Sequence, residues 1–140
     1  MHAPAILYPV FALALLTFLV LNLIPLARFR AAGRREVTIG DFRYGESAAV
    51  PPGVCLPNRN YMNLLEQPVL FYVVCVLIYA TGIGTPVMLA LAWSYVGLRC
   101  LHTVIHLAYN NVMHRLAVFC ISHAVLAVLW VDAFMSLPGR

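Results

Sequence analysis

Long apolar segments alternate with short polar ones along the whole chain. No charged residue falls between residues 3 and 27, and none between residues 67 and 98. The second run is too long for one span, and the Gly and Pro residues within 81–86 favour a turn followed by a helix start. Asn110 and Asn111 separate two further apolar segments. Because about 20 apolar residues cross a bilayer as a helix, the pattern predicts transmembrane helices over residues 5–27, 59–80, 86–109 and 112–136.

The composition narrows the class of protein. Of the 140 residues, 63% are hydrophobic and 10% are charged, and the mean hydropathy is +0.88. A soluble domain carries about 25% charged residues. These values exclude a water-soluble globule and a disordered chain. They predict one all-α membrane domain over residues 1–140, a four-helix bundle surrounded by lipid.

The positive charge is concentrated in one polar segment. The net charge is +4, and all nine basic residues are arginines. Five of them lie within the predicted loop 28–58. A basic soluble protein would suggest nucleic acid, but basic loops of membrane proteins stay in the cytoplasm. The loop is therefore expected on the cytoplasmic side, with both chain termini outside the cytoplasm and no nucleic-acid partner.

Ionisable residues also occur inside the predicted spans, where each of them costs free energy of insertion into the bilayer. Three polar residues of the second span share one helix face, and Pro68 after them predicts a kink. The third span repeats this arrangement, and the fourth begins near an arginine. In chain order these residues are Arg59, Asn63 and Glu66, then Arg99, His102 and His106, then Arg115.

Three interpretations of this cluster are open. Glu66 and Arg99 have similar predicted depths, so they could form a buried ion pair that fixes helix register. Alternatively, several donors converge on an anionic ligand that carries carboxylates and enters from the cytoplasm. The i, i+4 spacing of His102 and His106 also suits a metal or haem, with His123 or Glu66 as a third ligand. Arg99 would repel a cation there, so no metal site is expected.

The same residues resemble the signature of the MAPEG family, the membrane-associated proteins in eicosanoid and glutathione metabolism. The resemblance rests on Arg59-x-x-x-Asn63-x-x-Glu66-x-Pro68, and on Arg99-x-x-His102-x-x-x-His106 followed by Arg115. It implies a left-handed four-helix bundle that forms a homotrimer and binds glutathione between subunits, in the cytoplasmic half. By position it assigns glutathione binding to Arg59, Asn63, Glu66, Arg99 and His102, and catalysis to Arg115 and His106.

The resemblance also implies an activity and a location. Family members act as glutathione transferases, peroxidases or isomerases on lipophilic small molecules. The segment around residues 40–46 looks like that of bacterial members, which implies a bacterial inner membrane. The chain departs from the glutathione-using members at Met62, Leu116 and Phe119, where they carry polar or hydroxyl side chains. A non-catalytic membrane module that binds a lipid or an anionic metabolite is therefore the alternative function.

Overall fold

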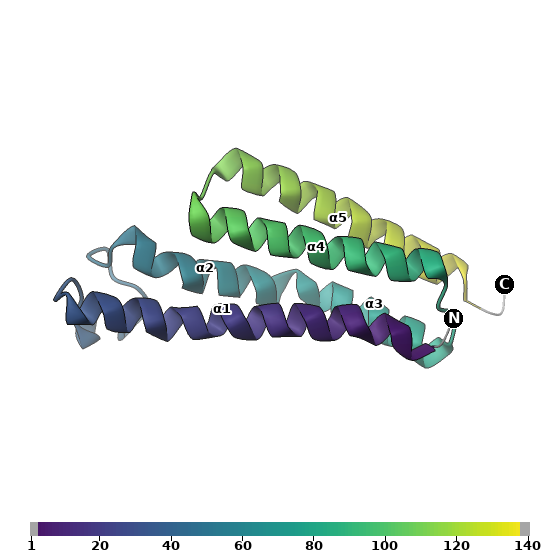
Figure 1. Cartoon of the computed structure of the whole chain (residues 1–140), viewed down its shortest axis with the longest axis horizontal. Coiled ribbons are helices and arrows are strands. Elements are labelled where there is room, and N and C mark those ends of the chain that lie inside the picture. The colour runs from purple at the N-terminus through teal and green to yellow at the C-terminus, as the bar shows by residue number, and fades with distance from the viewer. Residues whose placement is uncertain (1–2, 138–140) are drawn as a thin grey trace.

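The computed structural model describes residues 3–137 as a bundle of helices (Figure 1). Four helical segments are long and apolar enough to cross a membrane, which confirms the predicted number of spans. They are α1 (Leu7–Gly33), α2 with α3 (Pro52–Glu66 and Pro68–Thr81), α4 (Pro86–Ala108) and α5 (Val112–Met135). Two short 3-10 helices, η1 (Ala3–Ile6) and η2 (Ile39–Phe42), precede and follow α1.

Two helix ends differ from the expectation, and both extend beyond the apolar segment. The first helix continues to Gly33 instead of ending at residue 27, and the second begins at Pro52 instead of residue 59. Arginine and alanine are good helix formers, so the change to polar residues marks the border of the apolar region and not the end of the helix. Pro52 occupies the first helical turn, where its missing N–H costs nothing. The connecting loop therefore shortens to residues 34–51.

The hydrogen-bond ladder of the second span is interrupted between α2 and α3, while the Gln67 backbone stays helical, with φ of −73° and ψ of −42°. The helical hydrogen-bond pattern ends at Glu66 and restarts at Pro68, which leaves Gln67 as the joint. Pro68 has no N–H to donate to the carbonyl of Leu64, so the ladder cannot continue through it.

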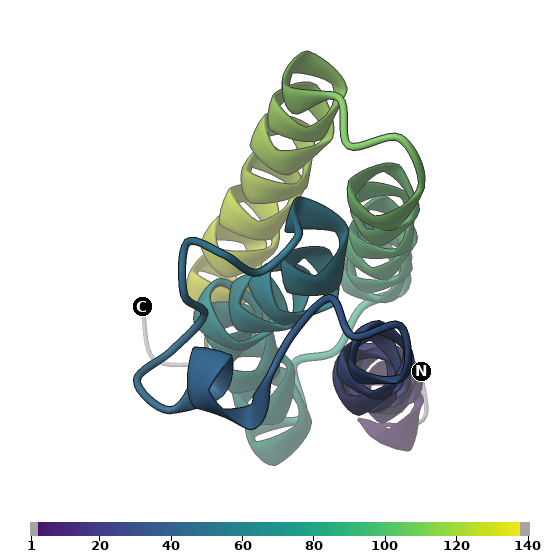
Figure 2. The same cartoon turned by 90° about the vertical axis from the view of Figure 1, so that its left-hand side faces the viewer.

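The helices pack as antiparallel neighbours. α4 and α5 lie side by side and are joined by a tight turn, while α1 runs along α2 (Figures 1 and 2). The turn between α4 and α5 lies at the same end as loop 34–51, and we call this the loop end (Figure 1). The start of α1 and the end of α5 lie at the opposite end. The main core includes Leu13, Leu64 and Phe71, whose ring stacks on Tyr95 with centroids 4.7 Å apart.

The loop itself is folded against the helices that flank it. A second apolar cluster forms there from Ala31, Val37, Val50, Val54 and Cys55. The Asp41 carboxylate accepts hydrogen bonds from Ser47 Oγ at 2.7 Å and from the backbone N and Oγ1 of Thr38, both at 2.8 Å. These bonds hold the pKa of the Asp41 carboxyl below its usual value of 3.8. Loop 34–51 is therefore an ordered element that packs against α1 and α2.

Candidate functional site

Arg99 lies at the centre of the polar interior. Its side chain is fully buried, and it reaches from α4 to the joint between α2 and α3. Nη1 donates to Gln67 Oε1 at 2.9 Å, and Nη2 donates to the Asn63 carbonyl oxygen at 3.2 Å and to Asn63 Oδ1. All three acceptors are neutral. The positive charge of Arg99 is thus solvated by amide oxygens alone.

The predicted ion pair between Glu66 and Arg99 is wrong. Within residues 3–137, the one pair of opposite charges in contact is Arg28 with Glu46, at 3.4 Å. Glu66 is instead exposed on α2. Gln67 follows Asn63 by four residues and shares its helix face, so it takes the position facing Arg99 that sequence analysis gave to Glu66.

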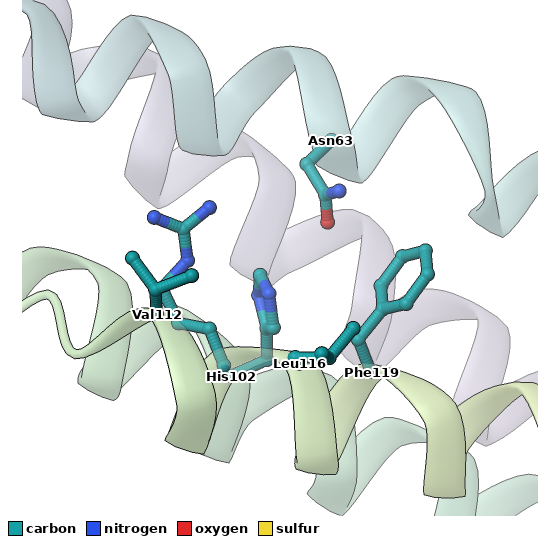
Figure 3. Close-up of a pocket in the computed structure, with 6 residues that line it drawn as sticks. Asn63, His102, Val112, Leu116 and Phe119 are labelled. Atoms are coloured by element: carbon teal, nitrogen blue, oxygen red, sulfur yellow. The ribbon is translucent and has the colours of Figure 1, made fainter.

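A cleft of about 240 Å³ opens between α2, α4 and α5. Figure 3 shows Asn63 on one side, Val112, Leu116 and Phe119 of α5 on the other, and His102 between them. Arg115 completes the lining. Three of the predicted site residues, Asn63, His102 and Arg115, therefore meet in one cleft, and no acidic side chain lines it.

The turn between α4 and α5 positions Arg115. Asn110 has a left-handed backbone, with φ of 49°, and Asn111 caps α5 by accepting a bond from the His114 amide at 3.0 Å. Asn110 Oδ1 then accepts a hydrogen bond from Arg115 Nη1 at 2.6 Å. Asparagine tolerates both the left-handed and the capping position, which explains why two of them stand here. The half-buried guanidinium is thereby held at the loop end of the cleft.

The histidines of α4 form a second part of the site. His102 and His106 are both buried, and their rings meet edge to face with centroids 5.8 Å apart. The Nδ1 atom of each ring is buried without a hydrogen-bond partner. Of the two, only His102 lines the cleft. Across residues 3–137, no group of three His, Cys, Asp or Glu side chains could hold a metal ion.

The remaining predicted residues stand apart from the cleft. Arg59 and Glu66 are exposed on α2 and do not line it. Arg99 does not line the cleft, but it donates a hydrogen bond to Asn63, which does.

Sequence reasoning missed Gln67 as a member of the site. Its amide nitrogen lies 2.6 Å from His123 Nδ1, so a polar chain runs from Asn63 through Arg99 and Gln67 to α5. The sequence does indicate Gln67, because it lies one helical turn after Asn63, on the same helix face, and directly before Pro68.

These features define an integral membrane protein whose four spans enclose a basic polar site. The chain belongs to the MAPEG family, whose family model matches residues 6–135, nearly the whole chain. Neither a curated protein nor a solved structure matches it.

Proposed function

We propose that this MAPEG protein binds glutathione, or a similar anionic thiol, in the cleft between α2, α4 and α5. The observation that carries the proposal is the charge of the cleft. Arg115 lines it, no acidic side chain does, and the buried Arg99 adds a positive charge behind Asn63. Because Arg99 donates to Asn63 Oδ1, the amide nitrogen of Asn63 remains available as a donor. Such a set of donors suits carboxylates and a thiolate.

We propose further that a homotrimer completes the site. The cleft of one chain, at about 240 Å³, is smaller than the roughly 300–1,000 Å³ of typical ligand pockets. Glu66 lies seven residues after residue 59, where the apolar part of the second span begins (66 − 59), or about 10 Å into it. An acidic side chain exposed to lipid there costs up to about 3 kcal/mol. A neighbouring copy that covers Glu66 and Arg59 removes this cost, and Glu66 can then accept the ligand's ammonium group.

The proposed chemistry is attack by the glutathione thiolate on an electrophilic carbon of a lipophilic substrate that enters from the bilayer. As the C–S bond forms, the bond from that carbon to its leaving group breaks, and the leaving group departs with the electron pair. Arg115 stabilises the thiolate. His106 packs edge to face against His102 and holds that ring in place beside the cleft. A lowered thiol pKa is what activates such a nucleophile. The thiol proton leaves to water at the mouth of the cleft.

Transferase or peroxidase turnover is expected to be slow. Leu116 and Phe119 line the cleft where a hydroxyl could have held the sulfur. This observation favours the second candidate, a non-catalytic module that binds a lipid or an anionic metabolite. The two candidates differ in whether glutathione binds and turns over.

The arginine-rich loop end is proposed to face the cytoplasm, where glutathione is available. Five arginines, at positions 28, 30, 34, 35 and 43, lie at this end. In a bacterial inner membrane, both chain termini then lie outside the cytoplasm.

Isothermal titration calorimetry of the purified protein in detergent tests the ligand. We expect glutathione to bind, and Arg115→Ala to weaken binding at least about tenfold, since a charge-assisted contact contributes roughly 1.5–3 kcal/mol. Arg34→Ala is the matched control, because Arg34 is exposed outside the cleft, and it should bind as the wild type does. Absence of binding at millimolar glutathione would overturn the assignment and favour the non-catalytic module.

A further inference from the structure

A second opening lies at the loop end of the bundle, between α1, α2 and α4, and we call it the α1 groove. Its volume is about 200 Å³, and it shares no residue with the cleft between α2, α4 and α5. Figure 2 looks onto the loop end and shows α1 and α4 on the same side of α2. Four leucines line the groove, at positions 23, 26, 56 and 107, and among residues 3–137 the one charged side chain in its lining is Arg30.

One face of α1 supplies leucines to the groove and then arginines beyond them. Leu23, Leu26 and Arg30 are spaced i, i+3 and i+7, which places them on one face of the helix. Arg34 follows Arg30 by four residues, and its backbone N–H donates to the Arg30 carbonyl oxygen at 3.2 Å. The helical turn therefore continues to Arg34, and the two arginines share the face of the two leucines.

The groove crosses the border between the hydrocarbon core and the headgroup layer. The charge-free apolar run of α1 ends at Ala27, and Arg30 and Arg34 follow it by three and seven residues. These steps correspond to about 5 and 10 Å along the helix. The headgroup layer is about 5–8 Å thick on each side of the core. The leucines accordingly lie at the level of acyl chains, and the two guanidinium groups at the level of lipid phosphates.

The charge of both arginines is unbalanced within the chain. Neither has an acidic partner within residues 3–137, where the one ion pair joins Arg28 to Glu46. Both side chains are exposed. Like charges one helical turn apart repel each other, and an anion held by both removes that repulsion. Arginine suits a phosphate in particular, because its planar fork of N–H groups can donate two hydrogen bonds to one phosphate group.

We propose that the α1 groove binds one anionic phospholipid of the surrounding leaflet. Arg30 and Arg34 hold its phosphate, and an acyl chain lies along the leucines. Gly53 leaves space beside the lipid, since a Cβ at this position would meet no atom within 4 Å outside its own helical turn. This site is separate from the cleft, so the inference holds whether or not glutathione binds there.

Native mass spectrometry of the purified protein in detergent tests the site. The probes are phosphatidylglycerol and phosphatidylcholine with identical acyl chains. We expect phosphatidylglycerol to bind more tightly, because the choline cation would lie beside two arginines. Arg30→Ala should weaken phosphatidylglycerol binding about tenfold, the loss of one charge-assisted contact. Arg43→Ala is the matched control, since Arg43 is exposed at the same end but does not line the groove, and it should bind as the wild type does.

A second variant tests the shape of the groove without changing its charge. Gly53→Phe places a large side chain in the groove, and it should reduce the bound fraction of phosphatidylglycerol. Glycerophosphoglycerol, the same headgroup without acyl chains, should not compete at equal concentration. Competition by it would identify the ligand as a soluble anion and overturn the lipid assignment.

Three further results would overturn the inference. The first is equal binding of the two lipids, and the second is phosphatidylglycerol binding that both Arg30→Ala and Gly53→Phe leave unchanged. The third is binding that Arg115→Ala weakens and Arg30→Ala does not, which would place the lipid in the cleft. The same spectra count subunits: a subunit number that Gly53→Phe changes while lipid binding persists would show that a second copy of the chain covers the groove.

Discussion

The adjacent residues Glu66 and Gln67 offer a sharp test of how the buried Arg99 is held. Replacing Gln67 with leucine removes the acceptor of Arg99 Nη1 and leaves that N–H unpaired in the interior. Replacing Glu66 with glutamine removes a charge that has no ionic partner within residues 3–137. The first change should therefore destabilise the protein strongly, and the second should not.

The expected magnitude follows from the burial of Arg99. Its side chain is fully buried, so water cannot replace the lost acceptor. A hydrogen bond to a charged group contributes about 1.5–3 kcal/mol, and an unsatisfied charged donor costs at least as much. For a chain of this length, Gln67→Leu should lower the Tm by roughly 5–12 °C.

Thermal unfolding followed by circular dichroism in detergent measures both variants under one condition. Glu66→Gln should unfold at or slightly above the wild-type Tm, because it removes a charge that has no ionic partner within residues 3–137. If Glu66→Gln loses as much as Gln67→Leu, an ion pair holds Arg99 after all. If neither variant changes the Tm, the amide bonds to Arg99 do not contribute to stability.

Three further predictions concern the topology, the loop and the chemistry. A cysteine at the exposed loop position Ala48 should react with an impermeant maleimide only after cell lysis, whereas one at Thr81 should react in intact cells; the reverse pattern would invert the topology. The native Cys55 cannot serve here because it is buried. The hydrogen bonds of ionised Asp41 stabilise the loop above the usual carboxyl pKa of 3.8, and this stabilisation is lost as the pH falls through the lowered folded pKa. Amide hydrogen exchange should accordingly be faster in Asp41→Ala at neutral pH, and equal rates would contradict the role of the carboxylate. Phe119→Tyr should increase conjugation of glutathione to a chloronitrobenzene, measured by absorbance; an unchanged rate in a variant that binds glutathione shows that the missing hydroxyl does not limit turnover.

The sequence was sufficient for the number of spans and for which polar helix faces meet. Charge-free stretches of membrane length follow from the cost of burying charge in lipid, so these stretches and the turn residues between them give the number of spans, but not the helix ends at Gly33 and Pro52. Helical spacing placed Asn63 on one face of α2 and Arg99 with His102 on one face of α4. Those faces meet in the structure.

The error at Glu66 has a general physical reason. Sequence analysis paired the two charges of similar depth because buried charges need partners. In the structure the Nη atoms of Arg99 donate to the side-chain amides of Gln67 and Asn63 instead. An argument from charge alone does not consider a neutral residue such as Gln67. Residues 66 and 67 also stand about 100° apart around the helix. Which of them faces α4 depends on the packing of α2, and the sequence does not specify that rotation.

The most direct test of the central claim is an experimental structure of the protein determined with millimolar glutathione. The account predicts a trimer with glutathione density in each cleft between α2, α4 and α5, and with the sulfur beside Arg115. A cleft that stays empty or holds lipid at that concentration would contradict it.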